Sequence, residues 1–190
     1  MTNPELLTLL QKKDSTAKKH LFETYYGRLA AIARRYCKNQ TQADEGFNVA
    51  FHKVFNKLSN QRQNKTLDLA DFLEREFIQE CVLFIKDIRS EYYVSSTVHA
   101  TEDANKNYNL FENHEWVDFN HVDTSVLIKS LQQMVPSQRL VFNLHVIDGL
   151  SLKEAATILE SGEETVKSNL EKARFNLQKN IENNLKGPKV

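Results

Sequence analysis

The chain has 190 residues, of which 41% are hydrophobic, and it contains only five Gly and three Pro. This composition supports a packed core and excludes a turn-rich β protein, while a formal net charge of zero gives no bulk attraction to nucleic acid. Two cysteines, Cys37 and Cys81, indicate buried free thiols in a reducing compartment. Because there is no apolar leader and no run approaching about 18 apolar residues, we expect a cytoplasmic protein without a membrane span.

The first 93 residues begin with the pattern of two helices. Asn3-Pro4-Glu5 is typical of a helix start, and Asp14 is suited to cap the helix that follows. In this second helix apolar residues recur at three- and four-residue spacing up to Tyr36. Several cations lie off the apolar stripe and are interpreted as solubilising surface: Arg28, Arg34, Arg35 and Lys38.

Two more helices complete this predicted bundle. Thr41 and Asp44 resemble a capping box for a third helix that extends to Leu58. The all-polar residues 59–66 indicate a loop, and an apolar stripe from Leu69 to Tyr92 indicates a fourth helix. We therefore expect one helical domain over residues 1–93.

The middle of the chain differs in charge and pattern. Residues 1–60 carry ten Lys/Arg and five Asp/Glu, whereas residues 101–130 carry two and six. Helical periodicity fails between Val94 and His121, so we expect a flexible acidic linker over residues 94–124. Its aromatic residues either pack on a neighbouring domain or dock in a groove of a partner: Tyr108, Phe111, Trp116 and Phe119.

A second, smaller helical domain is expected over residues 125–190. One helix reaches Met134, Pro136 opens the next, and Gly149 stops it. The stretch 150–177 then has the pattern of two short helices joined by a tight turn. This is the layout of a helix-turn-helix, whose second helix is offered to the DNA major groove. On pattern alone an ordinary helical hairpin within an all-α core is an equal alternative.

Details of the stretch 150–177 favour two helices. Ser151 and Glu154 form the capping box S-x-x-E, and Gly162 is placed where the chain must turn. The predicted fold class is therefore all-α: an N-terminal bundle, an acidic linker and a small C-terminal helix-turn-helix domain.

The order of these parts resembles the sigma-70-type RNA polymerase sigma factors of the extracytoplasmic-function group. Residues 21–29, LFETYYGRL, and 33–36, ARRY, are similar to the start of the family's region 2, which 42–45 and 51–55 continue. These segments would make the N-terminal bundle a region 2-like domain. In this family that bundle binds the clamp helices of core RNA polymerase and melts the −10 promoter element.

The C-terminal part resembles region 4 of the same family. The resemblance is carried by residues 134–142, MVPSQRLVF, by 149–156, GLSLKEAA, and by 163–168, EETVKS. In this family the small domain docks on the polymerase flap and reads the −35 element. The two resemblances together, in this order, cover nearly the whole chain.

The resemblance implies three sets of contact residues. Core-polymerase binding is expected at Asp44, Glu45, Asn48 and His52. Contacts on the −10 side are expected at Arg62, Asn64, Lys65, Lys86 and Arg89. Contacts on the −35 side are expected at His145, Thr165, Lys167, Ser168, Asn169 and Lys172.

Several positions depart from the family pattern. Asn48 and Val49 stand where the family usually has Gln followed by an acid, and Glu80, Asp87 and Glu91 add negative charge near Lys86 and Arg89. Lost phosphate contacts lower both the affinity for DNA and its salt sensitivity. We therefore predict weak intrinsic promoter recognition.

The −35 side departs in the same direction. Asn169 replaces a common Arg, although Asn can read adenine, and Glu171 adds an acid. Glu160 stands at the family's usual turn glycine, and that glycine moves to Gly162. These changes reduce the positive charge on the DNA-facing side of the recognition helix.

The leading hypothesis is a sigma factor that recruits core RNA polymerase to promoter DNA and starts transcription. Within it, a DNA-targeting partner, either an activator or an RNA-guided protein, would supply the targeting that the chain lacks, and an anti-sigma factor is a further candidate partner. The alternatives are a stand-alone helix-turn-helix regulator and a degenerate sigma that acts as an adaptor. No membrane partner is implied.

An enzyme is not expected. The six His show no H-E-x-x-H or Cys/His metal spacing, and the sequence has no phosphate-binding glycine loop and no G-x-S-x-G elbow. No catalytic residue, metal or cofactor is therefore predicted. His145 is interpreted as a surface or phosphate-contacting residue.

Overall fold

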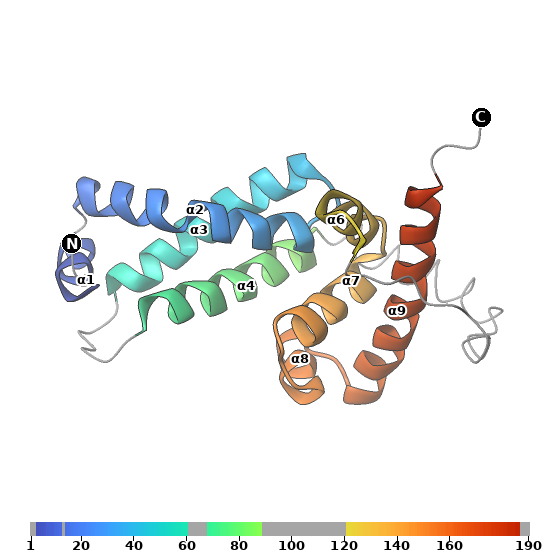
Figure 1. Ribbon diagram of the computed structural model, residues 1–190. Helices are drawn as coiled ribbons and strands as arrows, with labels where there is room; N and C mark the ends of the chain where they lie inside the picture. The colour runs from blue at the N-terminus through green and yellow to red at the C-terminus, as the bar shows by residue number, and fades with distance from the viewer. Residues whose placement is uncertain (1–2, 13, 61–67, 89–120, 187–190) are drawn as a thin grey trace.

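The computed structural model describes residues 3–12, 14–60, 68–88 and 121–186. All regular structure in these ranges is helical, which confirms the predicted all-α fold. The elements form two groups that lie side by side, with α1–α4 in one and α6–α9 in the other (Figure 1). No helix in the described ranges is long and apolar enough to cross a membrane.

The first group is a bundle of four helices. It consists of α1 (Asn3–Gln11), α2 (Ser15–Tyr36), α3 (Gln40–Asn60) and α4 (Leu69–Asp87). Its core is built from one apolar stripe per helix, as the periodicity predicts, and Phe77 at its centre is fully buried. The long helices α2, α3 and α4 run alongside one another, and α1 packs across the end of α2 and α3.

The caps explain where these helices begin. The Asp14 carboxylate accepts hydrogen bonds from the backbone N–H groups of Thr16 and Ala17, both at 2.9 Å, which confirms the predicted cap. The predicted capping box at Thr41 is wrong. Asn39 caps α3 instead, because its side chain accepts from the N–H of Gln42 at 2.8 Å.

Two predicted boundaries differ from the structure or lie beyond it. Helix α3 continues through Ser59 and Asn60, and the Ser59 hydroxyl donates to the carbonyl of Phe55 at 2.8 Å. A hydroxyl that bonds back into its own helix in this way suits a helical position. The rest of the predicted loop, the end of the fourth helix beyond Ile88 and the four linker aromatics lie outside the described residues.

The second group contains α6 (Thr124–Gln132), α7 (Pro136–Phe142), α8 (Leu152–Leu159) and α9 (Glu163–Leu185). Helices α8 and α9 form the predicted helix-turn-helix. The Ser151–Glu154 capping box is present in full, with the Ser151 N–H donating to the Glu154 carboxylate at 2.8 Å.

The predicted single helix from Pro136 to Gly149 is interrupted. After α7 the chain forms a π-helical turn, η3 (Asn143–Ile147). At this point the Asn143 side chain donates to the carbonyl of Arg139 at 2.8 Å, and a side chain that bonds into the ladder favours such a bulge. Gly149 then adopts φ +75°, as expected for a glycine that ends a helix.

The hydrophobic core does not stop between the two groups. Leu140, Val141 and Leu144 belong to the same buried cluster as the bundle residues. A separate small cluster holds α6 against α9, and it consists of Leu131, Met134, Ala173, Leu177 and Ile181. Helices α7 and α8 thus bury their apolar sides against the bundle, while α6 and α9 also pack on each other.

Candidate functional site

One face of α3 carries the residues expected to bind core polymerase. Asp44, Glu45, Asn48 and His52 are all exposed, and their spacing places them along one side of the helix. Val49 lies among them and is 38% exposed. The structure brings this set together as a continuous polar stripe with an apolar residue within it.

An aromatic cleft adjoins this stripe. Phe22 and Tyr26 of α2 are 38% and 44% exposed, and the Tyr26 ring meets the ring of Phe47 edge to face at 5.2 Å between centroids. The cleft has a volume of about 400 Å³, and its walls include Asp44 and Asn48. Exposed aromatic residues beside polar groups are typical of protein-binding surfaces. No sequence pattern singles out this cleft, because its exposed rings have the same helical spacing as the buried apolar residues of α2.

Only one residue of the predicted −10 set lies in the described ranges. The Lys86 side chain is 17% exposed, and its ammonium forms an ion pair with the Glu160 carboxylate of the α8–α9 turn at 2.8 Å. Arg62, Asn64, Lys65 and Arg89 lie outside the described residues.

Glu80 does not oppose DNA binding as the sequence suggested. Its carboxylate is buried and pairs with Lys53 at 3.2 Å and with Lys57 at 2.8 Å, both on α3. Burial acts to raise the pKa of Glu80, but the hydrogen bonds from Lys57 and Lys53 outweigh it and lower this pKa. Glu80 is therefore an internal partner of α3.

The predicted −35 residues gather at the start of α9. Thr165, Lys167 and Ser168 are exposed, and Asn169 and Lys172 are half-buried on neighbouring turns. His145 lies on η3 and donates from Nδ1 to the carbonyl of Leu150 at 2.7 Å, so its other ring nitrogen is the one left for a ligand.

The charge of this face is balanced. Residues 163–174 carry three acidic side chains and three basic ones: Glu163, Glu164 and Glu171, and Lys167, Lys172 and Arg174. A balanced face releases few counterions from a phosphate backbone.

The turn between α8 and α9 has an unusual geometry. Glu160 adopts φ +53°, the left-handed conformation that favours glycine, whereas Gly162 has φ −72° and serves as the N-cap of α9. Gly162 therefore does not take over the conformation of the family's turn glycine. The left-handed conformation is adopted by Glu160 itself. Glu160 is also the residue that pairs with Lys86 of α4.

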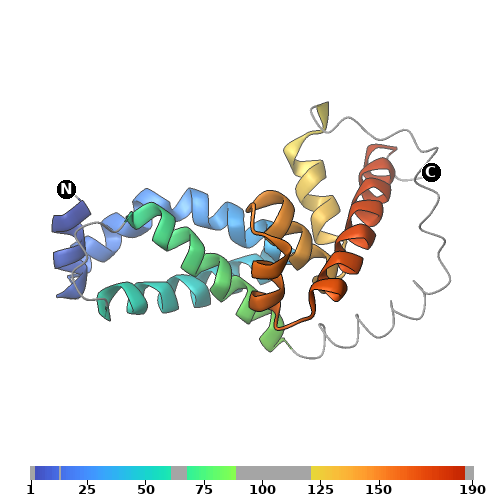
Figure 2. The same cartoon turned by 90° about the horizontal axis from the view of Figure 1, so that it is seen from below.

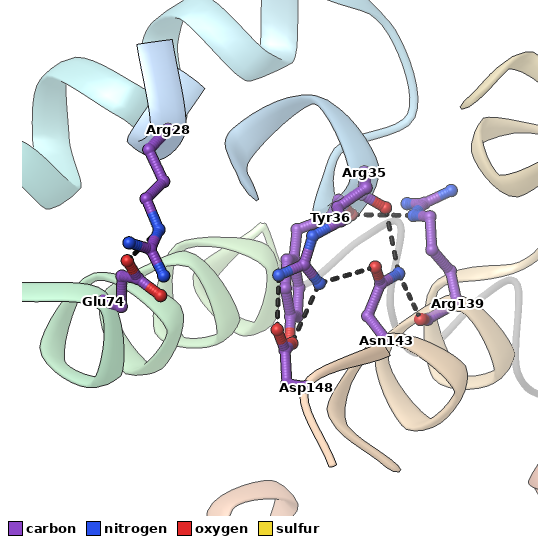
Figure 3. A network of polar contacts seen from close by, with 7 residues as sticks. All are labelled: Arg28, Arg35, Tyr36, Glu74, Arg139, Asn143 and Asp148. Atoms are coloured by element: carbon purple, nitrogen blue, oxygen red, sulfur yellow. Dashed lines mark hydrogen bonds and ion pairs between the residues drawn. The ribbon is translucent and has the colours of Figure 1, made fainter. Parts of the chain in front are cut away.

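A polar network joins the two groups of helices at the end of α2 (Figure 3). The guanidinium of Arg35 binds the Asp148 carboxylate through both terminal nitrogens, with one contact at 2.9 Å. The Tyr36 hydroxyl donates to the same carboxylate at 2.6 Å. Burial and the Asp148 carboxylate both raise the pKa of Tyr36 well above its ordinary value, so its hydroxyl keeps the proton that it donates.

Arg35 is thus not the solubilising surface residue that the sequence suggested. Its side chain is only 13% exposed and that of Asp148 only 11%. Burial acts to lower the pKa of Arg35, but the hydrogen bond and charge of Asp148 outweigh it, and the pKa is raised. The pair is held charged, although its members are 113 positions apart in the sequence.

Arg139 and Asn143 extend the network along α7. Arg139 is buried and donates to three backbone carbonyls, those of Tyr36 at 2.7 Å, Gln132 at 3.0 Å and Met134 at 2.8 Å. The Asn143 amide donates to the carbonyl of Arg35 at 3.0 Å and accepts from its guanidinium at 2.9 Å. The network therefore ties α2, α6, α7 and η3 to one another.

The geometry contains no site for catalysis by metal ions within the described ranges, since no group of three or more His, Cys, Asp or Glu there could hold one. The fold defines a helix-turn-helix domain in which the start of the second helix is exposed. In DNA-binding domains of this class, the second helix lies in the major groove.

Residues 125–177 match the family model described as sigma-70, region 4. This match lies within the C-terminal helix-turn-helix unit, and the resemblance to region 4 expected from the sequence is confirmed over this segment. No match is found among curated proteins.

Two solved structures are similar to the chain. One is the sigma factor RpoE in complex with the anti-sigma factor NepR from Bartonella quintana, with 19% identity, a TM-score of 0.48, and coverage of 86% of this chain and 96% of that one. The other is CnrH in complex with the cytosolic domain of CnrY, with 17% identity, a TM-score of 0.45, and coverage of 95% and 97%.

Proposed function

We propose that the protein is a sigma factor, which binds core RNA polymerase through the bundle and directs transcription initiation. The single observation that carries this proposal is the region 4 match of residues 125–177. The face of α3 supports it independently, because it offers an acidic and amide stripe beside an exposed aromatic cleft of about 400 Å³. A stand-alone DNA-binding regulator would have no use for such a surface on a separate bundle.

Titration of the full-length protein against core polymerase tests this proposal. Asp44→Arg reverses a charge at the N-terminal end of the α3 stripe without touching the buried core, because Asp44 is exposed. We expect its affinity for core polymerase to fall at least tenfold, or about 1.4 kcal/mol. Glu23→Arg is the matched control, since Glu23 is exposed on α2 and pairs only with exposed Lys19 at 3.8 Å among the contacts described.

If wild-type protein does not bind core polymerase at all, or if Glu23→Arg weakens binding as much as Asp44→Arg, the assignment of the α3 face is wrong. Binding of DNA without any polymerase binding would favour the stand-alone regulator.

The finer part of the proposal concerns DNA. We infer weak intrinsic promoter recognition, with targeting supplied by a partner such as an activator or an RNA-guided protein. The support is the balanced charge of residues 163–174 and the ion pair that occupies Lys86. Each phosphate contact adds about 0.9 to the slope of log affinity against log salt, so few contacts give weak, flat binding.

A salt titration of the full-length protein on promoter DNA measures that slope. We expect a shallow dependence, with a slope below about 3, and a steeper dependence for Glu164→Lys combined with Glu171→Lys, which restore a basic face. Tight, steeply salt-dependent binding by the wild-type protein alone would contradict weak intrinsic recognition. An anti-sigma factor stays a candidate partner in this proposal.

A further inference from the structure

The bundle exposes four large apolar side chains in its described part. They are Phe22 at 38%, Tyr26 at 44%, Val49 at 38% and Leu83 at 40%. Phe22 and Tyr26 line the aromatic cleft, and Val49 lies within the polar stripe of α3. Leu83 lies on α4, outside the surface that the proposed function assigns to core polymerase. Its position relative to Val49 decides whether it belongs to the same surface.

Ion pairs fix the register between α3 and α4. Lys57 of α3 pairs with Glu76 of α4 at 2.7 Å, and Lys53, one turn earlier on α3, pairs with Glu80, one turn later on α4, at 3.2 Å. Residue numbers therefore fall along α3 as they rise along α4. Figure 2 shows the same arrangement, with the chain running in opposite directions along these two packed helices.

This register places Val49 and Leu83 next to each other across the α3–α4 seam. Val49 precedes Lys53 by one helical turn, and Leu83 follows Glu80 by about one turn, so both lie one step beyond that ion pair in the same direction. Leu83 is also seven residues from Glu76, which puts both on the side of α4 that is turned toward α3. We call these two exposed apolar residues, Val49 and Leu83, the seam patch.

The lysines beside the seam patch are already paired. Lys53 binds Glu80, and Lys57 binds both Glu80 and Glu76, so these four side chains carry a balanced charge. A charged group of a partner that covered the patch would lose its water, and these paired side chains would not compensate it. An apolar side chain in the same place would gain by burial. The seam patch therefore fits an aliphatic or aromatic side chain of a partner.

We propose that the seam patch anchors an apolar side chain of core polymerase, and that this contact helps to select the polymerase that the chain binds. The inference rests on the proposed function, because Val49 makes the patch continuous with the α3 stripe. It extends the polymerase-binding surface onto α4 through Leu83. It also adds an apolar contact to a polar surface, as in protein interfaces whose buried core is more apolar than their rim.

The direction in which an added charge changes the affinity tests the chemistry of the polymerase side chain. The affinity of the full-length protein for core polymerase is measured for wild type, Val49→Glu and Leu83→Glu. We expect both variants to bind at least about tenfold more weakly, since each places a carboxylate against an apolar group. Gln79→Glu is the matched control and should bind like wild type. Gln79 is exposed on α4 one turn before Leu83, but it lines the space between α4 and α8.

A milder variant, Leu83→Ala, separates apolar contact from charge and decides the question if Leu83→Glu does not fold. Leu83 is 40% exposed, so its truncation leaves the buried core in place, which circular dichroism checks. We expect it to weaken polymerase binding about threefold. The ratio to wild type should be the same at low and at high salt, because ions do not screen apolar contacts, whereas the ratio for Asp44→Arg should shrink as salt rises.

Stronger polymerase binding by Val49→Glu would overturn the proposal, because it would show a basic group of the polymerase at this position. Wild-type affinity of folded Leu83→Glu and Leu83→Ala would also overturn it, and weaker binding by Asp44→Arg would then leave the proposed function standing. A wild-type dimer in sedimentation that Leu83→Glu dissociates would assign the patch to a second copy of the chain instead. If wild type does not bind core polymerase at all, the proposed function fails and this inference fails with it.

Discussion

The two halves of the molecule are stabilised in different ways. The bundle α1–α4 supplies most of the larger buried cluster, in which the ring of Phe47 packs against the rings of Phe51 and Phe77. Among the described residues, the C-terminal helices have a separate cluster of five buried apolar residues, and most of their other buried apolar residues belong to the joint core.

In the C-terminal half, polar contacts between helices add to this smaller apolar cluster. Asn180 and Asn184 of α9 donate to the carbonyl and hydroxyl of Ser130 on α6, at 3.1 and 2.9 Å. Hydrogen bonds of this kind contribute modestly to stability but tolerate few alternative packings. The comparison teaches that the bundle relies mainly on apolar packing, whereas the helix-turn-helix half relies more on directional polar contacts.

The largest expected effect lies in the bundle core. Phe77→Ala removes a fully buried ring and should lower the free energy of unfolding by about 3–5 kcal/mol. Leu177→Ala in the small C-terminal cluster should cost less, about 2–3 kcal/mol. Urea denaturation followed by circular dichroism measures both. Equal losses would mean that the two halves do not differ as described; Leu185→Ala, which is 54% exposed, is the control and should change little.

A similar effect is expected at the joint between the halves. Arg139→Met preserves the aliphatic volume but leaves the carbonyls of Tyr36, Gln132 and Met134 without their buried donor. Stranding buried polar groups costs about 1–3 kcal/mol each before relaxation, so we expect a net loss of about 3 kcal/mol in urea denaturation. A stability equal to wild type would show that these bonds do not fix the joint.

Two helical glycines separate packing from backbone effects. A Cβ on Gly46 of α3 would lie 2.9 Å from the Phe84 ring, so Gly46→Ala should destabilise by about 1–3 kcal/mol. A Cβ on Gly27 of α2 meets nothing within 4 Å, so Gly27→Ala should stabilise by about 0.5–1 kcal/mol through helix propensity. Thermal unfolding of the two variants should shift in opposite directions, and a shift of the same sign would contradict the close approach of α3 and α4.

An effect of similar small size concerns Cys37. Burial raises the pKa of this thiol to about 12. Above pH 9 the unfolded thiol ionises while the folded one stays protonated, so stability falls as pH rises. We expect wild type to lose about 1 kcal/mol more than Cys37→Ala between pH 9 and 10, measured by urea denaturation. Parallel pH profiles for the two proteins would show that Cys37 is not held in an apolar site.

The sequence predicts local structure well where a short pattern decides it. The apolar stripes, the Asp14 cap and the Ser151–Glu154 box depend on residues no more than four positions apart, and the structure confirms them. The Thr41–Asp44 capping box does not form, because Asn39 directly precedes α3 and its side chain accepts from the N–H of Gln42.

What the sequence could not show depends on contacts between distant segments. Nothing local distinguishes Arg35 from its exposed neighbour Arg34, and only the placement of Asp148 turns it into a buried partner. Glu80 likewise looks like a surface acid in the sequence, and only its ion pair with Lys57 of α3 shows that it is buried. The left-handed conformation of Glu160 does not follow from the sequence, because glycine is the residue that usually adopts it and Gly162 lies two positions further on. The predicted contact residues on α3 and α9 are exposed together, but their roles stay predictions.

The most direct measurement of the central claim is purification of the protein with core RNA polymerase, followed by mapping of the DNA that the complex holds. We predict that wild-type protein co-purifies with core polymerase at defined promoters, that Asp44→Arg does so at least tenfold less, and that Glu23→Arg matches wild type. Recovery of DNA without polymerase, or of polymerase in equal amounts with all three proteins, would contradict the account.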